Sequence, residues 1–351
     1  MSLKMNLIRR YFSLTLSLLL FLQSAVSQQN FPEIDRAFKM NQQALGKDAV
    51  MMIYKNGKIV YENRLGDFTT ASPEKIASAS KWLTAALVMT FVDEGKLSLD
   101  DTVGKFLPVF TKYKKGDIQI RHLLSHSLGL DQDPIRLITL VNRNNKYNTI
   151  EEEVNDFAKK KDVVAAPGIE FHYGNMGLNI AAHVIEVLSG KGFEQIFQER
   201  IGRPLAMGST TFVKNGDVPN PSGGAVSTAQ DYMNFQIMFL NKGIFRGKRI
   251  LQKSTVEKMM EVAASQTMMK YTPAAAEGFD YGFGVWIQEK DKDGKTTVVS
   301  SPGLFGTWPY VDYCRGYACI IFTKNLLGER KKDIYLAIKK TVDLYFPSSC
   351  Q

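Results

Sequence analysis

The most constraining feature of this chain is an apolar segment, residues 82–92, that directly follows the motif Ser78-Ala79-Ser80-Lys81. Apolar residues on every side of a helical pattern indicate a helix that is buried all round. Residues three apart share a helix face, so the Lys81 amine can reach the Ser78 hydroxyl. The pattern therefore predicts a central buried helix that carries a serine and a lysine at its N-terminus.

This pair is typical of covalent catalysis. A serine becomes a useful nucleophile when a neighbouring base accepts its proton, and a lysine can be that base if burial lowers its pKa. The N-terminus of a helix also favours developing negative charge. A second copy of the pattern, Ser72-Pro73-Glu74-Lys75, contains a proline and precedes no apolar run. We interpret that copy as a loop.

The fold class follows from strand patterns at the two ends of the chain. Residues 50–64 alternate around the turn Lys55-Asn56-Gly57-Lys58, which predicts a hairpin. Further strands are predicted at 284–288, Thr296–Ser300, 307–313 and Tyr317–Thr323, followed by a helix at 331–345. Residues 80–270 are mostly helical in pattern. We therefore expect an α/β (α+β) fold: an antiparallel sheet flanked by N- and C-terminal helices, with an inserted, mostly helical region. The sheet half covers about 35–75 and 280–350, and the helical half about 80–275.

Residues 1–27 have the pattern of a secretory signal peptide. Basic residues at Lys4, Arg9 and Arg10 precede an apolar run at 11–22, and Ala25-Val26-Ser27 supplies a small-residue cleavage site. The run is too short for a comfortable transmembrane span, although an uncleaved anchor is the alternative. We expect an exported protein, periplasmic or secreted, with no stable membrane insertion after cleavage. Residues 28–351 are then predicted to form a single domain.

Charge and histidine placement argue against two other classes of function. The 44 basic and 35 acidic residues are scattered, and basic runs are at most three residues long. One of them, Lys159-Lys160-Lys161, matches a solvated helix end. This distribution does not favour a nucleic-acid partner. The four histidines show no metal-ligand spacing. We therefore expect neither a metal nor another cofactor, and a small molecule or peptide as the substrate.

Three cysteines in an exported chain allow one disulfide. Cys314 and Cys319 flank residues 315–318, which have the pattern of a hairpin tip, so these two could pair across the strands. Pairing of either one with Cys350 is the alternative, and three buried free thiols are equally compatible with the sequence.

Around Ser78, an ordered set of motifs resembles the serine β-lactamase-like family, which includes class C β-lactamases, DD-peptidases and related esterases. The resemblance covers roughly residues 35–345. Beyond the Ser78 motif, its landmarks are residues 95–101, residues 123–130, Pro167-Gly168, Tyr173-Gly174-Asn175, residues 222–229 and Tyr281-Gly282-Phe283-Gly284. The resemblance implies an α/β half and a helical half with the site in the cleft between them.

The resemblance also implies a role for each residue of the site. Ser78 would be the nucleophile and Lys81 its proton acceptor. Tyr173 would move the proton to the leaving group, and either Tyr173 or Lys81 could be the formal base, because coupled groups share their titration. Asn175 would orient the substrate or Lys81. The oxyanion hole would consist of the backbone N–H groups of Ser78 and Leu304.

The third motif departs from the family pattern. Where relatives carry Lys-Thr-Gly or His-x-Gly, this chain has Ser301-Pro302-Gly303. Ser301 carries no charge, and Pro302 has neither a hydroxyl nor an N–H to donate. Gly303 would let the backbone approach the substrate closely. We therefore expect a serine hydrolase acting on an ester or amide, closer to an esterase than to a true β-lactamase.

Three other functions remain as alternatives or are disfavoured. A DD-peptidase or β-lactamase would use the same acylation residues. A catalytically idle cell-wall peptide-binding protein would have no chemical need of Ser78, Lys81, Tyr173 and Asn175 together. An α/β-hydrolase would require a Gly-x-Ser-x-Gly elbow, which the sequence lacks.

Overall fold

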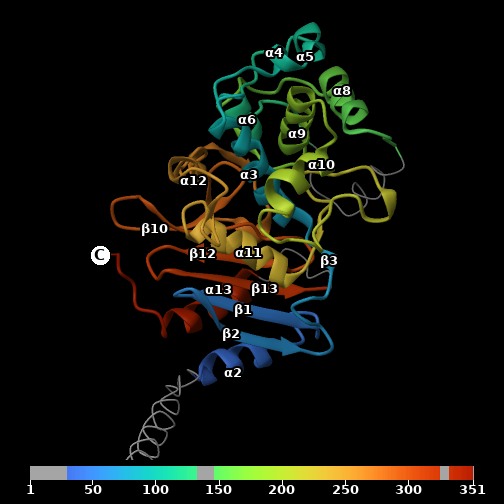
Figure 1. The fold of residues 1–351 in the computed structure, drawn as a ribbon. Coiled ribbons are helices and arrows are strands. Elements are labelled where there is room, and N and C mark those ends of the chain that lie inside the picture. The colour runs from blue at the N-terminus through green and yellow to red at the C-terminus, as the bar shows by residue number, and fades with distance from the viewer. Residues whose placement is uncertain (1–29, 133–145, 325–331, 351) are drawn as a thin grey trace, which may run out of the picture. The chain divides into compact units, whose positions relative to one another are not determined.

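A seven-stranded antiparallel sheet is the scaffold of the protein (Figure 1). The computed structural model describes residues 30–132, 146–324 and 332–350. The strand order β2-β1-β13-β12-β11-β10-β9 pairs the first strands of the chain with the last one, as the sequence predicts. The strands of this sheet are β1 (Ala49–Lys55), β2 (Lys58–Leu65), β9 (Asp280–Tyr281), β10 (Trp286–Lys290), β11 (Thr296–Ser300), β12 (Trp308–Asp312) and β13 (Tyr317–Thr323).

The region between the two groups of strands is mostly helical, which confirms the predicted fold class. The structure also contains three short two-stranded pairs that the sequence did not predict: β3 (Glu74–Lys75) with β5 (Val226–Ser227), β4 (Phe171–His172) with β8 (Met269–Tyr271), and β6 (Ile244–Phe245) with β7 (Lys248–Arg249). The α-helices of the described residues are α2 (Pro32–Met40), α3 (Ser80–Asp93), α4 (Val103–Phe106), α5 (Pro108–Lys112), α6 (Ile120–Leu124), α8 (Ile150–Lys160), α9 (Met176–Ser189), α10 (Phe193–Phe197), α11 (Ala229–Leu240), α12 (Lys253–Met259) and α13 (Lys332–Asp343).

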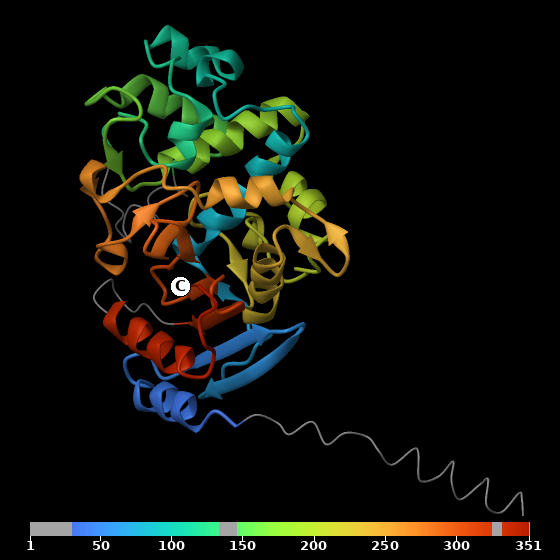
Figure 2. The same ribbon diagram turned by 90° about the vertical axis from the view of Figure 1, so that its left-hand side faces the viewer.

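Both faces of the sheet are covered by helices. Alternate residues of a strand point to opposite faces, and Ala318, Ile320 and Phe322 of β13 belong to the main hydrophobic core. Their neighbour Tyr317 points the other way and donates to Asp343 Oδ1 of α13 at 2.7 Å. Figure 2 shows α13 and α11 on opposite sides of the sheet. The face that α11 covers is therefore the one continuous with the helical region.

Helix α3 is the centre of the core. Every residue from Ser80 to Phe91 is buried, as the apolar pattern predicts. Trp82 packs edge-on against two rings of α11, with centroid distances of 5.4 Å to Phe235 and 4.8 Å to Phe239. The helix thus lies against α11, which also packs on the sheet.

One strand begins later than the sequence predicts. We expected a strand at 284–288, but β10 is Trp286–Lys290. Gly284 has a φ of +76°, a left-handed conformation that regular strands do not use. A Cβ at this position would lie 2.1 Å from Ala85 Cβ of α3. Gly284 therefore marks a close approach of the backbone to the central helix, and regular pairing starts only after it.

The predicted signal peptide, residues 1–27, lies outside the described ranges, so its presence stays a prediction. Among the residues that are described, no helix is both long and apolar enough to cross a membrane.

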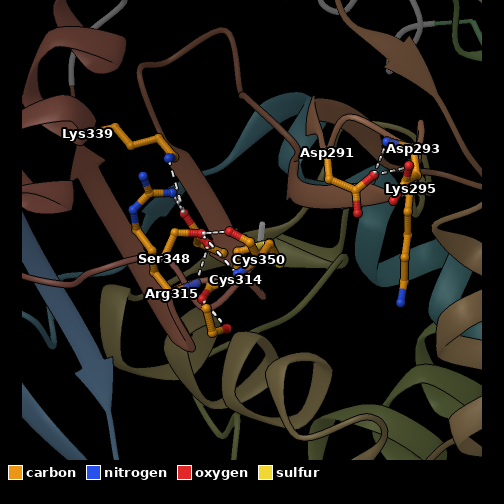
Figure 3. Close-up of a disulfide and its surroundings, with 10 residues drawn as sticks. Asp291, Asp293, Lys295, Cys314, Arg315, Lys339, Ser348 and Cys350 are labelled. Carbon is orange, nitrogen blue, oxygen red and sulfur yellow. Dashed lines mark hydrogen bonds and ion pairs between the residues drawn. A yellow bond between two sulfur atoms is a disulfide. The ribbon is translucent and has the colours of Figure 1, made fainter.

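The disulfide joins Cys314 to Cys350, which was the alternative pairing (Figure 3). Cys314 lies in the turn between β12 and β13, and the chain end reaches it: the Ser349 N–H donates to the Cys314 carbonyl oxygen at 2.7 Å. The predicted pairing of Cys314 with Cys319 is not formed. Cys319 lies inside β13, opposite Tyr310, and is a buried free thiol. Burial raises the pKa of Cys319 to about 12, so this thiol is unreactive at neutral pH.

We predict that Cys350→Ser lowers the free energy of unfolding by about 2–4 kcal/mol, because the disulfide restricts the unfolded chain. Urea unfolding under oxidising conditions measures this change. The matched control is Cys319→Ala, which keeps the disulfide and should still lose stability when a reducing agent is added. A Cys350→Ser protein that unfolds at the wild-type urea concentration would contradict the assignment.

Candidate active site

Ser78 lies in a 3₁₀ turn, Ala77–Ala79, immediately before α3. The preceding residue, Ala77, has a φ of +45°, which is unfavourable for a residue with a side chain. Two contacts hold the turn in place: the Ile76 N–H donates to the Ala225 carbonyl at 3.0 Å, and the Tyr232 hydroxyl donates to the Ala79 carbonyl at 2.8 Å. The turn that carries the serine is thus fixed by residues of the 225–232 segment.

The Lys81 amine lies among three oxygen acceptors. Its Nζ is 3.2 Å from Ser78 Oγ and 3.1 Å from Asn175 Oδ1. The third acceptor, the Ser222 carbonyl oxygen, is 2.8 Å away. The Lys81 side chain is only 1% exposed. Because an ammonium group has three N–H donors, these oxygens satisfy all of them in the charged state.

Burial lowers the pKa of Lys81 to about 7, because an apolar environment disfavours the ammonium form. A large share of the molecules therefore carries a neutral amine near neutral pH. In that state, two N–H groups can donate to Asn175 and Ser222, and the nitrogen lone pair faces the Ser78 hydroxyl. The arrangement can accept a proton from Ser78 without moving any side chain.

Tyr173 lies beside the same amine. Lys81 Nζ is 4.9 Å from the centroid of the Tyr173 ring, and Tyr173 is almost fully buried. The ring packs against Trp286 with a centroid distance of 5.1 Å. The Tyr173 N–H donates to the Tyr271 carbonyl at 3.1 Å, just beyond the short β4–β8 pair. Tyr173 and Lys81, far apart in the sequence, therefore lie side by side in the structure.

The His126 ring packs against the Tyr173 ring, and the imidazole is kept neutral. Its ring centroid is 4.6 Å from that of Tyr173, and its Nε2 is hydrogen-bonded to the Tyr281 hydroxyl at 3.1 Å. Burial, and secondly the charge of Lys81, hold the pKa of His126 well below its usual value. The imidazole therefore adds no positive charge beside the Lys81 amine.

The third motif lies in the loop after β11. Ser301 Oγ donates to the Ser78 carbonyl oxygen at 3.3 Å, so its hydroxyl faces the turn that carries the serine. A Cβ on Gly303 would lie 2.2 Å from the Ile76 carbonyl oxygen, a distance that no side chain tolerates. Gly303 is therefore required for the loop to lie directly against the Ser78 turn.

The two N–H groups predicted for the oxyanion hole belong to these two adjoining segments. Within the described ranges, neither the Ser78 N–H nor the Leu304 N–H makes a hydrogen bond. The neighbouring Gly303 N–H, by contrast, donates to the Thr307 carbonyl at 2.8 Å. Two unused backbone donors in adjoining segments are what binding of an oxyanion requires, although their role stays a prediction.

Two contributors to the site have no clear signature in the sequence. The first is the backbone carbonyl of Ser222, because the type of side chain at a position does not predict a backbone contact with Lys81. In the sequence, only the position of Ser222 in the landmark at 222–229 indicates that this residue lies near the site. The Tyr232 hydroxyl holds the Ala79 carbonyl across more than 150 residues of sequence. Contacts of this kind depend on tertiary packing and not on a local pattern.

Comparisons with known proteins identify the family of the chain. The Beta-lactamase family model matches residues 38–341. The solved structure of a β-lactamase-like protein from Bacteroides dorei DSM 17855 is 28% identical, with a TM-score of 0.77, and the match covers 90% of this chain and 98% of that chain. Protein flp of Staphylococcus aureus (strain MW2) is 29% identical over 175 residues, 47% of this chain and 34% of flp.

A further relative is the D-alanyl-D-alanine-carboxypeptidase/endopeptidase AmpH of Escherichia coli (strain K12). It is 24% identical over 259 residues, which are 65% of this chain and 64% of AmpH. The matches thus span between about a third and two thirds of these curated relatives. Because the family model covers most of the sequence, the chain belongs to the β-lactamase family of hydrolases.

Proposed function

We propose that this protein is an exported serine hydrolase that forms an acyl-enzyme on Ser78 and acts on an ester or amide. The observation that carries the proposal is the buried Lys81 amine, 3.2 Å from Ser78 Oγ and with a pKa of about 7. A base with a pKa near the working pH is the one best suited to proton transfer. The proposed export rests on the leader pattern at residues 1–27.

The reaction begins with attack of Ser78 Oγ on the substrate carbonyl carbon. The hydroxyl proton moves to the neutral Lys81 amine, and the carbonyl oxygen becomes an oxyanion that accepts hydrogen bonds from the Ser78 and Leu304 N–H groups. Removal of one such donor typically costs about 3–4 kcal/mol of transition-state stabilisation. Transfer of a proton through Tyr173 to the leaving group then breaks the ester or amide bond. Water hydrolyses the acyl-enzyme in the reverse sequence of proton transfers and restores Ser78.

The assignment of Ser78 is tested by covalent labelling. We predict that Ser78→Ala abolishes both turnover of p-nitrophenyl butyrate and labelling by a fluorophosphonate probe, because Ser78 is the hydroxyl that the Lys81 amine activates in the proposed mechanism. The control is Ser72→Ala in the other Ser-x-x-Lys copy. Ser72 Oγ accepts from the Thr69 N–H at 3.0 Å in a turn, so this variant should keep both signals. Labelling that persists in Ser78→Ala would contradict the proposal.

The substrate class is suggested by the third motif. In β-lactamases that resemble this chain, a cation and a hydroxyl in this motif help to bind the substrate carboxylate. Here Ser301 is neutral and its hydroxyl donates to the Ser78 carbonyl. A charge-assisted hydrogen bond contributes roughly 1.5–3 kcal/mol. Its loss should therefore weaken selection for a carboxylate-bearing substrate by roughly 10–150-fold, whereas acylation by a neutral ester does not depend on it.

We accordingly predict a higher kcat/KM for p-nitrophenyl butyrate than for a chromogenic cephalosporin. Ser301→Lys should raise cephalosporin acylation, because it returns a cation to the motif, and Ser301→Ala is the control for loss of the hydroxyl alone. Steady-state kinetics on both substrates measures the ratio. A wild-type kcat/KM for the cephalosporin equal to or above that for the ester would contradict the esterase assignment.

A DD-peptidase activity is the second candidate. It is favoured by the match to AmpH, although that match covers only 64% of AmpH. A D-Ala-D-Ala peptide presents a free carboxylate, which the neutral third motif does not select. Hydrolysis of such a peptide with a kcat/KM above that of the ester would favour this candidate. A catalytically idle peptide-binding protein would bind such peptides without labelling at Ser78.

A further inference from the structure

A chain of buried polar groups leads away from the Lys81 amine into the helical region. The Ser222 carbonyl oxygen accepts from Lys81 Nζ at 2.8 Å, and the N–H of the same residue donates to Asn179 Oδ1 at 3.0 Å. Asn179 Nδ2 in turn donates to Glu153 Oε2 at 2.9 Å. Ser222 and Asn179 are fully buried, and Glu153 is 4% exposed. This series of hydrogen bonds therefore connects α3, through Ser222, to α9 and α8, and none of its residues is exposed to the solvent.

The Asn179 amide can adopt only one orientation in this series of hydrogen bonds. A backbone N–H only donates, so the Asn179 amide oxygen must be the atom that faces Ser222. The Asn179 NH₂ group is then left to donate to Glu153. Glu153 thus holds the amide in the orientation that the Ser222 N–H requires.

Helix α9 holds Lys81 in two ways. Asn175, at the start of the helix, accepts directly from Lys81 Nζ at 3.1 Å. Asn179 is one turn further and, through Ser222, acts on the same nitrogen. Residues at i and i+4 share a helix face, so both amides point to the same side of α9. A second contact fixes the same peptide group, because the Pro221 carbonyl and the Ser222 N–H belong to one peptide: Thr84 Oγ1 of α3 donates to the Pro221 carbonyl at 2.6 Å.

We propose that Asn179, oriented by Glu153, is a positioning residue: it holds the N–H of Ser222 and so fixes the backbone of that residue, whose carbonyl then accepts one N–H of Lys81 and leaves the amine lone pair facing Ser78. This inference rests on the proposed role of Lys81 as the proton acceptor. Asn179 touches neither Ser78 nor the place of the reacting carbonyl in the proposed mechanism. Its effect is on the direction of the Lys81 amine.

The first test is Asn179→Leu, which keeps the approximate size and removes both hydrogen bonds. We expect kcat for p-nitrophenyl butyrate to fall by roughly 10–100-fold with little change in KM, because misplacement of a reacting group by about 1 Å can cost on the order of 100-fold. The matched control is Asn234→Leu. Asn234 is a buried asparagine of α11 whose amide donates to the Ala206 carbonyl at 3.3 Å. It should lose stability but keep the wild-type kcat.

The second test separates positioning from simple stabilisation. In the double variant Glu153→Gln/Asn179→Asp, the new amide donates to the new carboxylate, whose other oxygen accepts from the Ser222 N–H. The two hydrogen bonds of residue 179 and the total charge are preserved, so kcat should be substantially restored relative to Asn179→Leu. The negative charge, however, moves closer to Lys81, favours its ammonium form and raises its pKa. The acid limb of kcat/KM should then shift to higher pH, by about one pH unit.

The results distinguish this inference from the proposed function. If Ser78→Ala remains active, both fail. If Ser78→Ala is inactive and folded Asn179→Leu has the wild-type kcat, only the positioning role is overturned. If Asn179→Leu does not fold, as judged by circular dichroism, the double variant decides: a kcat close to that of the wild type together with a shifted acid limb supports the role, and a folded double variant whose kcat stays low overturns it.

Discussion

The burial of one amine is the constraint on which the site depends. Lys81 lies in the first turn of a helix that is buried from Ser80 to Phe91, and its side chain is almost completely buried. A buried ammonium group is unfavourable unless it is hydrogen-bonded. Three oxygens, from Ser78, Asn175 and Ser222, meet that need. The same burial lowers the pKa of Lys81 to about 7, so the amine that these hydrogen bonds hold in place is also a suitable base.

The two halves of the protein contribute different parts of this site. The sheet half brings the loop after β11, where Gly303 lies so close to the Ile76 carbonyl that no side chain fits. The helical half brings Tyr173 and Asn175, at the start of α9. Helix α3 lies between them, with Trp82 against α11. A change that shifts α3 relative to either half would therefore alter the distance between Ser78 and the groups that act on it.

Local patterns predicted much of the fold and of the site. The strands at Thr296–Ser300 and Tyr317–Thr323 have the predicted bounds, and Ser78 and Lys81 meet as their spacing indicates. Features set by tertiary contacts were not predictable. The hydrogen bond from Lys81 ends on a backbone carbonyl, the start of β10 depends on the approach of Gly284 to α3, and the disulfide joins residues that no local pattern relates.

The central claim is that the buried Lys81 amine accepts the proton of Ser78. The most direct test is the pH dependence of the rate at which a fluorophosphonate probe labels Ser78, in the wild type and in Lys81→Met. Because only the neutral amine is a base, the wild-type rate should rise as the pH passes through about 7 and then level off. Lys81→Met should be labelled far more slowly and lack this midpoint. A wild-type rate that is constant between about pH 5 and pH 9, or the same midpoint in Lys81→Met, would contradict the account.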